Sequence, residues 1–415
     1  MHDLPPDQAV FPEPFEPSAE VTVGQQGGDL RGTDHRVVQA GIDYVASLGG
    51  GTVNLLPGLY ECHDRVKLRS NVTLIGRGPG VVLRKSNGFE MPLLTDGDYG
   101  EARVYVPEPQ RWQVGMGVTI GDDATGGWDD IVATVVGVKD GALLLDRPLL
   151  GRDVLLERGA WVRHVFPVVE MVGVERCTIE NLVIEGNKTT NPALNGCRGG
   201  AVYTYRSRHL TMRRLQVKDF NGDGISFQTS HEVVVEACEV SDCTGLGLHP
   251  GSGSQRPRVV GCHVHHNTQD GLFICWRVRH GVFADNLIES NGRCGLSIGH
   301  KDTENLIDGN RILSNGSHGL LFRNERPELA AHRCIVRRNT ITDNGRRRAD
   351  GCGIRVEGST TQLTIENNEI NCTKGARQVV GIWLGASTDR ISISNNSFDG
   401  HVDADLKRED ARSIL

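Results

Sequence analysis

The stretch from Asn291 to Arg323, "NGRCGLSIGHKDTENLIDGNRILSNGSHGLLFR", repeats its own pattern after 24 residues. Asn291 recurs as Asn315, and the segment "GLSI" that begins at Gly295 recurs as "GLLF" at Gly319. A fixed period of this length is the sequence signature of a repeat architecture, in which each repeat is one structural unit stacked on the next. The stretch therefore predicts a solenoid.

Three series of residues carry this period through the chain. The first consists of glycines that open short alternating segments, at Gly224, Gly247, Gly271, Gly295, Gly319, Gly353 and Gly381. The second consists of Cys238, Cys262, Asn286, Asn310, Asn339, Asn368 and Asn396, and the third of Cys243, Asn267, Asn291, Asn315 and Asn344. Stacked asparagines can hydrogen-bond along the pile, and glycine or asparagine can adopt the positive φ that each corner needs. We therefore predict an all-β parallel β-helix of about ten coils at 24 residues per repeat, since the leucine spacing of a leucine-rich repeat is absent.

The regions before and between the coils have their own signals. The segment "TDHRVVQAGIDYVASLGGG" predicts a helix over 34–48, capped by Thr33 or Asp34, that covers the open end of the solenoid. Residues 91–166 break the rhythm with hairpin-like strands and hold Trp112, Trp128 and Trp161, which we expect to pack its core, with sugar stacking as the alternative. The predicted parts are an N-terminal arm (1–32), a capping helix with the first coils (33–90), an inserted β-subdomain (91–166), the main coils (167–402) and a C-terminal tail (403–415).

Composition limits the functions that the chain can have. The net charge of −7 argues against a general nucleic-acid binder. Eleven cysteines are scattered without a CxxC pair or the His/Cys spacing of a zinc site, so we expect them to be small buried hydrophobes and predict no metal site. The opening "MHDLPPDQAVFPEPFEP" has no signal-peptide pattern, and no stretch approaches the roughly 20 apolar residues of a membrane span. We expect no membrane partner, and a location that is either cytoplasmic or reached after removal of a leader.

The helix cap, the segment "LRSNVTLIGRG" and the asparagine-bearing coils resemble the pectate-lyase-like superfamily of right-handed parallel β-helices. This resemblance covers most of the chain except the insert and both tails. It implies a right-handed β-helix. Because the superfamily includes lyases, epimerases, hydrolases and phage tail proteins, it leaves the activity open.

Strand alternation predicts which side chains project from the face that carries the coil glycines. The second and fourth residues after each glycine should face solvent. They include Ser226, Gln228, His249, Phe273, Arg323, Arg355 and Glu357, and the neighbouring turns add Trp276, Arg277, His300, Lys301, Glu325, Asp223, Asp270 and His318. From this face we take as candidate substrate-binding residues Arg277, Gln228, Phe273, Trp276, His300, Glu325, Arg355 and Asp223.

Lys301 and Arg323 are 22 residues apart, which places them on adjacent coils where their long side chains can converge. Arg277 lies one coil before Lys301. A lysine among other cations can lose its proton near neutral pH and act as a base, while an arginine can neutralise a carboxylate. These two roles suit abstraction of the proton α to a uronate carboxylate. The alternative is a rim of solvated charges.

The same segment resembles the catalytic stretch of chondroitinase-B-like and alginate-lyase β-helix lyases. That resemblance implies that Lys301 is the base and that Arg323 neutralises the carboxylate or donates a proton. The acidic residues that bind calcium in that family are replaced by "RCGLSIG". We therefore expect no required cofactor, with calcium as the alternative.

Other activities stay open. The segments "TGLGLHPGSG" and "HHNTQDGLF" resemble alginate C5-epimerase modules, in which Asp270 would match a catalytic-region aspartate, but the tyrosine and aspartate of the family's Tyr-Gly-Phe-Asp-Pro-His are Leu246 and His249 here. An inverting glycoside hydrolase using Asp223 and Asp270 is a second alternative. A non-catalytic glycan-binding or tail-type solenoid is the third. We favour an enzyme that cleaves an acidic polysaccharide or oligosaccharide by β-elimination, with Lys301, Arg323, His249 and Asp270 as candidate catalytic residues, and a homo-oligomer is compatible with the sequence.

Overall fold

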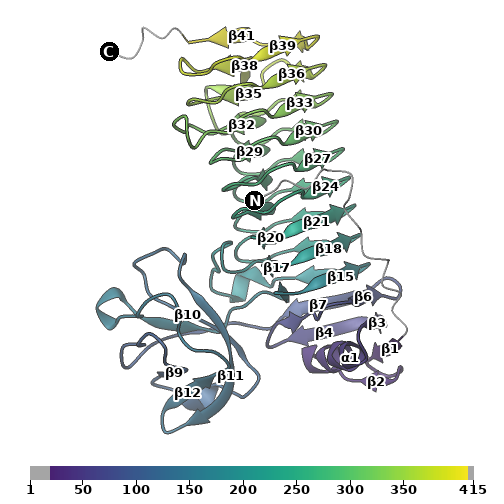
Figure 1. Ribbon diagram of the computed structural model, residues 1–415, viewed down its shortest axis with the longest axis vertical. Helices are drawn as coiled ribbons and strands as arrows, with labels where there is room; N and C mark the ends of the chain where they lie inside the picture. Colours follow the sequence, from purple (N-terminus) through teal and green to yellow (C-terminus); the bar gives the residue numbers. More distant parts are fainter. Residues whose placement is uncertain (1–18, 410–415) are drawn as a thin grey trace, which may run out of the picture.

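The computed structural model describes residues 19–409, which form a stack of coils closed by a helix at one end, with a small β-domain beside the first coils (Figure 1). Each coil contributes one strand to each of three parallel sheets, so the chain is a parallel β-helix as predicted. Sheets B and C have eleven strands each, close to the number of coils expected from the repeat. No helix within residues 19–409 is long and apolar enough to cross a membrane.

Sheet A comprises, in spatial order, β2 (Leu30–Arg31), β1 (Ala19–Gly24), β3 (Gly51–Leu55), β6 (Val72–Gly76), β15 (Glu175–Glu180), β18 (Arg208–Arg213), β21 (His231–Glu236), β24 (Arg258–Val260), β27 (Val282–Ala284), β30 (Leu306–Asp308), β33 (Ile335–Arg337), β36 (Thr364–Glu366) and β39 (Ser392–Ser394). Sheet B comprises β4 (Gly58–Cys62), β7 (Val81–Lys85), β16 (Val183–Glu185), β19 (Gln216–Lys218), β22 (Glu239–Ser241), β25 (His263–His265), β28 (Leu287–Glu289), β31 (Arg311–Leu313), β34 (Thr340–Thr342), β37 (Glu369–Asn371) and β40 (Ser397–Asp399). Sheet C comprises β5 (Val66–Lys67), β14 (Val169–Val172), β17 (Val202–Tyr205), β20 (Ile225–Gln228), β23 (Leu248–Gly251), β26 (Leu272–Phe273), β29 (Leu296–Ile298), β32 (Leu320–Phe322), β35 (Gly351–Val356), β38 (Gln378–Leu384) and β41 (Ala404–Arg408).

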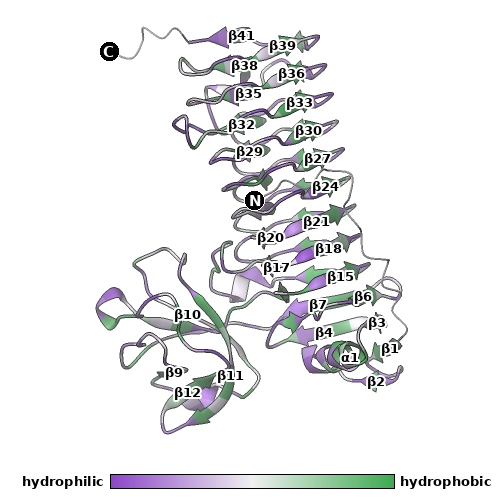
Figure 2. Ribbon diagram, viewed as in Figure 1, coloured by the Kyte–Doolittle hydropathy of each residue, from purple (hydrophilic) through white to green (hydrophobic). Residues whose placement is uncertain are grey.

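The core fills the interior of the coils because strand residues alternate between inside and outside. Figure 2 shows hydrophobic and hydrophilic residues on the same strands of sheet A. The inward residues, such as Phe283, Ile307 and Val336 on successive strands, are fully buried. All eleven cysteines are free and ten are buried, which confirms the expectation of small buried residues for those ten, while Cys197 is partly exposed.

The asparagine ladders are present, and each asparagine bonds to its equivalent on the next coil. Asn310, for example, donates from Nδ2 to Asn339 Oδ1 at 2.9 Å and accepts from Asn286 Nδ2 at 2.9 Å. The expectation that ladder asparagines adopt positive φ is wrong. That conformation falls on the preceding residue, such as Asp285 before Asn286 or Gly309 before Asn310. The turn thereby leaves the asparagine side chain pointing inward.

The coil glycines have a steric cause rather than a conformational one. None of the glycines at 247, 271, 295 and 319 has a positive φ. A Cβ on Gly295 would lie 2.3 Å from Ile312 Cγ2 of sheet B, and one on Gly319 would lie 2.5 Å from Ile341 Cγ2. Sheets B and C therefore approach each other at these corners only because the side chain is missing.

The capping helix is α1 (His35–Ser47), which is capped by Asp34 and covers the first coils with Val38, Ile42 and Val45, as predicted. The Asp34 side chain accepts from Arg36 N–H at 2.9 Å. Residues 1–18, which include the whole opening segment "MHDLPPDQAVFPEPFEP", lie outside the described residues. The predicted C-terminal tail is partly wrong, because residues 404–408 form β41 at the end of sheet C.

The insert folds as one six-stranded sheet, in the order β8 (Glu90–Pro92), β13 (Trp161–Arg163), β10 (Gly117–Gly121), β11 (Ile131–Lys139), β12 (Ala142–Leu145) and β9 (Arg103–Tyr105). The short helices η2 (Pro109–Arg111) and η3 (Leu156–Arg158) lie within it, and η4 (Lys188–Thr190) lies in the coil region. Trp112 and Trp161 are buried, as expected, but Trp128 is 44% exposed, so the core-packing role predicted for Trp128 is wrong.

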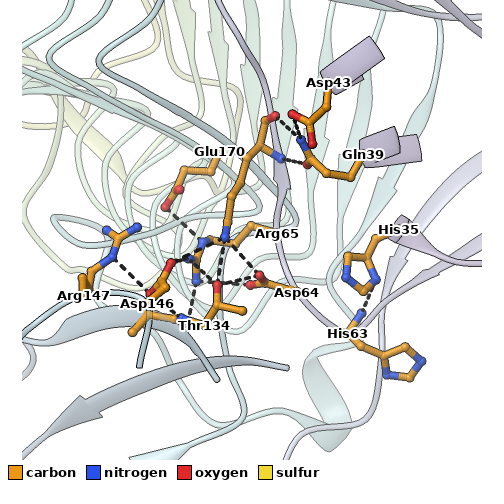
Figure 3. Close-up of polar contacts among 12 residues, drawn as sticks. His35, Gln39, Asp43, His63, Asp64, Arg65, Thr134, Asp146, Arg147 and Glu170 are labelled. Atoms are coloured by element: carbon orange, nitrogen blue, oxygen red, sulfur yellow. Dashed lines mark hydrogen bonds and ion pairs between the residues drawn. The ribbon is translucent and has the colours of Figure 1, made fainter. Parts of the chain in front are cut away.

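A buried arginine joins the insert to the solenoid (Figure 3). Arg65, which is 1% exposed, donates to Ala133 O at 2.8 Å and Thr134 Oγ1 at 3.1 Å, both in β11. It also forms ion pairs with Asp64 at 3.2 Å and Glu170 at 3.3 Å in the solenoid. A charge this deeply buried is stable only with such partners, so the contact fixes how the insert stands beside sheet C.

Candidate active site

The outer face of sheet C carries one column of side chains in register across successive coils. The column consists of Tyr203, Ser226, His249, Phe273, Ser297, Leu321, Arg355 and Trp383. The predicted register is therefore correct. Three of the twelve candidate site residues, His249, Phe273 and Arg355, lie in the column itself.

The prediction that the outward side chains of sheet C face solvent is wrong for Ser226, Gln228 and His249. Ser226, Gln228 and His249 are 0%, 2% and 4% exposed. The segment before β17 covers them: Ser226 donates to Gly196 O at 2.6 Å. Gln228 donates to Ser226 Oγ at 2.9 Å and fits only because Gly251 has no side chain, since a Cβ there would lie 2.5 Å from Gln228 Oε1.

His249 and Asp223 form a buried pair at the floor of this region. His249 Nδ1 lies 2.8 Å from Asp223 Oδ2, and the other carboxylate oxygen accepts from Leu246 N–H at 2.9 Å. The carboxylate acts as acceptor, so Nδ1 carries the proton and Nε2 is the basic ring nitrogen. Within residues 19–409, Nε2 makes no hydrogen bond. A histidine held in this way can accept a proton through Nε2.

Asp270 occupies the corresponding place two coils later but has no histidine partner. Its Oδ1 accepts from Cys294 N–H at 2.7 Å and lies 3.8 Å from Arg293 Nε. Burial raises the pKa of the Asp270 carboxyl, and Arg293 opposes that shift. His318, at the same place further on, accepts from Cys352 N–H at 3.2 Å through Nδ1. This position therefore serves first to bond the backbone of the next coil.

Arg323 lies flat across the outer face. Its guanidinium stacks on Phe273 at 4.3 Å, and Phe273 in turn meets the His249 ring edge-on at 5.6 Å. Gly299 makes room for it, since a Cβ there would lie 2.6 Å from Arg323 Nε. Nη1 donates to Ser297 Oγ at 2.9 Å and Nη2 to Ile274 O at 2.8 Å, two coils back. Arg323 thus reaches toward His249.

A buried aspartate that sequence reasoning missed supports Arg323. Asp302, fully buried, lies 3.3 Å from Arg323 Nη2 and accepts from the N–H groups of Val278 and Gly299. Burial raises the pKa of its carboxyl to about 7, with Arg323 acting in the opposite direction. Its only sequence signal is that it follows Lys301 at a turn.

Lys301 lies in the turn after β29, one coil from Arg323, as its position in the repeat predicted. Its backbone has a φ of 64° and its N–H donates to Leu329 O at 2.6 Å. Its Nζ makes no hydrogen bond or ion pair within the described residues. The Arg277 N–H donates to His300 O at 2.9 Å in the neighbouring turn.

Aromatic rings form a strip along this edge of the sheet. Trp276, which is 38% exposed, stacks on His300 with centroids 4.8 Å apart, and His300 Nδ1 lies 3.5 Å from Glu325. Trp128 of the insert meets Trp276 at 5.4 Å. The contact between Trp128 and Trp276 could not be foreseen from the sequence, because the two residues are almost 150 positions apart.

The loop of residues 121–130 carries Trp128 to the solenoid. Arg198 Nε donates to Trp128 O at 2.5 Å, and Asn195 donates to Gly126 O at 2.9 Å. A cavity of about 400 Å³ lies beneath the loop and is lined by both Asp130 and Asp223. Asp130 is 6% exposed, its Oδ1 has no hydrogen-bond partner, and burial raises its pKa to about 6.

Arg355 lies farther along the same column. Its Nε donates to Glu357 at 2.5 Å, and its guanidinium stacks on Trp383 at 4.0 Å. These contacts hold the Arg355 guanidinium against its own coil and the next one.

Among residues 19–409, the three-residue group of possible metal ligands lies on sheet B, and none of this size lies on the outer face of sheet C.

Comparisons with known proteins agree with this architecture. A search of curated proteins gives no match to the sequence. The chain resembles the A-module of the Azotobacter vinelandii mannuronan C-5 epimerase AlgE4, with a TM-score of 0.60, 16% identity, and coverage of 93% of this chain and 97% of the other. It also resembles a hyperthermoactive exopolygalacturonase from Thermotoga maritima, with a TM-score of 0.56, 13% identity, and coverage of 96% and 92%. A third similar structure is the Dettilon tailspike protein gp208, with a TM-score of 0.54, 13% identity, and coverage of 95% and 63%.

At these identities the structural likeness establishes the fold alone. The family model described as right handed beta helix region matches residues 168–326 and 279–398, which together span more than half of the chain. The match covers the coils that carry the asparagine ladders and the column on sheet C. The chain therefore belongs to the right-handed β-helix family.

Proposed function

We propose that the protein cleaves a uronate-containing polysaccharide by β-elimination on the outer face of sheet C, with His249 as the general base. The observation that carries this proposal is the buried His249–Asp223 pair, at 2.8 Å, with Nε2 free of protein partners in the described residues. Asp223 orients the ring and stabilises the imidazolium that forms when Nε2 takes the proton α to the uronate carboxylate. The same imidazolium can return that proton to the leaving glycosidic oxygen, so that one C–H and one C–O bond break and one C=C bond forms.

The abstraction places negative charge on the carboxylate, which a cation must balance. Arg323 supports this role, because it reaches across Phe273 toward His249 and retains N–H groups that bind no protein acceptor in the described residues. Arg293 and Lys301 are further cations of this face. Lys301 remains the alternative base, as the resemblance to β-helix lyases implies, and its unpaired Nζ supports that alternative.

The aromatic strip supports binding of a chain of sugar rings. Trp276 and Trp128 offer apolar surface at the edge of the column, as binding sites for organic ligands commonly do. Two of the similar structures are named for mannuronan and polygalacturonate chemistry, which supports a uronate polymer as substrate. C5-epimerisation would begin with the same proton abstraction, so the products must distinguish the two reactions.

Hydrolysis is a second candidate because of Asp130. A buried carboxyl with its pKa raised to about 6 suits a general acid, and Asp223 lines the same cavity as a second carboxylate. This pairing replaces the predicted pair of Asp223 and Asp270, because the cavity lining includes Asp223 and Asp130 but not Asp270.

The test is a panel of alginate, polygalacturonate, chondroitin and hyaluronan incubated with the full chain. β-Elimination yields an unsaturated uronate whose ultraviolet absorbance rises as the chains shorten. Reducing ends that form without that absorbance would favour hydrolysis. A changed epimer ratio in the proton NMR spectrum without cleavage would favour epimerisation. Binding without any turnover would identify a glycan-binding solenoid.

A further inference from the structure

A histidine-rich cluster lies on the outer face of sheet B, away from the proposed active site. Glu239 in β22 is in register with His263 in β25, and His265 in β25 is in register with Glu289 in β28. Because Val264 between the two histidines points inward and is fully buried, both imidazoles project from the same side of the strand. Their rings lie 4.1 Å apart, centroid to centroid.

We propose that Glu239, His263 and His265 bind a divalent transition-metal ion of the zinc class. One ligand atom from each of these side chains lies within 4.8 Å of the other two, so modest side-chain adjustment brings them onto one ion. Two imidazoles and a carboxylate are donors that zinc prefers, and water can complete the coordination. All three residues are partly exposed, so an ion can reach them from solvent.

In each of these two histidines, the ring nitrogen that would not bind the metal already has a hydrogen-bonding partner. His263 Nε2 lies 2.9 Å from Glu289 Oε1, which leaves Nδ1 for the metal. His265 Nδ1 lies 2.7 Å from His266 Nδ1, and its Nε2, 3.2 Å from Glu239 Oε1, is the atom available to the metal. Outer partners that hold the remote nitrogen of a ligating histidine are the usual arrangement of metal sites, because they fix the ring and its tautomer.

Ordinary His–Glu ion pairing is a weaker account of this cluster. His209 and Glu232 on sheet A form such a pair at 2.8 Å, and no group of three possible ligands in the described residues includes them. Pairing with Glu289 uses only Nε2 of His263 and leaves its Nδ1 without a hydrogen bond in the described residues, beside the His265 ring at 4.1 Å. A shared metal ion gives this nitrogen a partner. It would also link neighbouring coils of sheet B.

The experiment titrates the tag-free full chain with zinc chloride in a calorimeter and repeats the titration with cobalt(II), whose absorption spectrum reports its ligands. We expect one ion per chain, and loss of binding in His265→Ala. Glu289→Gln should weaken binding by about 10–100-fold, because it replaces the charged acceptor at the outer nitrogen of His263 with a neutral one. His209→Ala is the matched control, since its side chain is 38% exposed against 39% for His263, and should bind as the wild type does.

Circular dichroism of each variant checks that the coils remain folded, and His263→Gln gives a second ligand variant if His265→Ala does not fold. The proposal is overturned if the wild type binds no zinc. It is equally overturned if His265→Ala and His263→Gln bind as tightly as the wild type, since the ion would then lie elsewhere, such as at the partly exposed thiol of Cys197.

Discussion

Replacing Asp223 with asparagine should disable the reaction while leaving the fold intact. Asparagine keeps an oxygen that can accept from Leu246 N–H, now at 2.9 Å, so the backbone bond between coils survives. The amide must then present its NH₂ group to His249 Nδ1, at the present 2.8 Å. Nδ1 becomes the acceptor and the ring proton moves to Nε2. The base is thereby lost without removing any atom of His249.

The expected loss of kcat in Asp223→Asn follows from the role of Asp223, which keeps His249 Nε2 basic. A positioned general base contributes about 10²–10⁴-fold to a rate, which corresponds to about 3–5 kcal/mol of barrier. We expect kcat of Asp223→Asn to fall within that range, with KM and the melting temperature nearly unchanged. The replacement must be isosteric, because Gly196 packs so closely that a Cβ there would lie 1.7 Å from Asp223 Oδ2.

The assay is the initial rate of ultraviolet absorbance on the polymer that the wild type cleaves. Asp223→Asn combined with His249→Gln should be no slower than His249→Gln alone, because the two residues act as one unit. Wild-type turnover in a folded Asp223→Asn protein would refute the reasoning. So would losses that simply add in the double variant.

Three further outcomes test the ladder, the insert and the cofactor expectation. Asn310→Ala removes four buried hydrogen bonds and leaves Asn286 N–H without its acceptor, so the free energy of unfolding in guanidinium should fall by about 3–6 kcal/mol. Asn396→Ala, at the partly exposed end of the ladder, should cost less than half as much, and equal costs would contradict the ladder account. Asp130→Asn should stabilise the protein by up to about 3 kcal/mol at pH 7, because burial raises the pKa of Asp130 from 3.8 to about 6 and the folded state therefore loses stability as pH rises from about 4 to 6. That gain should vanish near pH 4, and a gain independent of pH would contradict the assignment. A chelator should leave turnover on the active polymer unchanged, whereas loss that calcium restores would contradict the expectation of no required cofactor.

The coils, the ladders and the capping helix could be predicted because each depends on a local pattern that recurs along the sequence. Asn286 and Asn310 are 24 residues apart and occupy equivalent positions in successive coils. The steric reason for the coil glycines could not be predicted from the sequence. A Cβ on Gly295 fails because of Ile312 on another sheet, and only the three-dimensional packing shows that contact.

The candidate site was predictable in register but not in environment. The repeat placed His249, Phe273 and Arg323 on one face, and they do lie together. The burial of His249 was missed because the segment near residue 196, which covers Ser226 and Asp223 beside it, is distant in sequence. Asp302 was missed because its role depends on the Val278 N–H of the previous coil. The His263 cluster was missed because the search for metal ligands followed cysteine spacing.

The most direct test of the account compares His249→Gln and Lys301→Ala on the uronate polymer that the wild type cleaves. Initial rates of unsaturated product are measured side by side, with circular dichroism to confirm that both variants are folded. The account predicts that His249→Gln loses nearly all turnover and that Lys301→Ala keeps a substantial part of it. Wild-type rates in His249→Gln together with an inactive Lys301→Ala would contradict it and assign the base to Lys301.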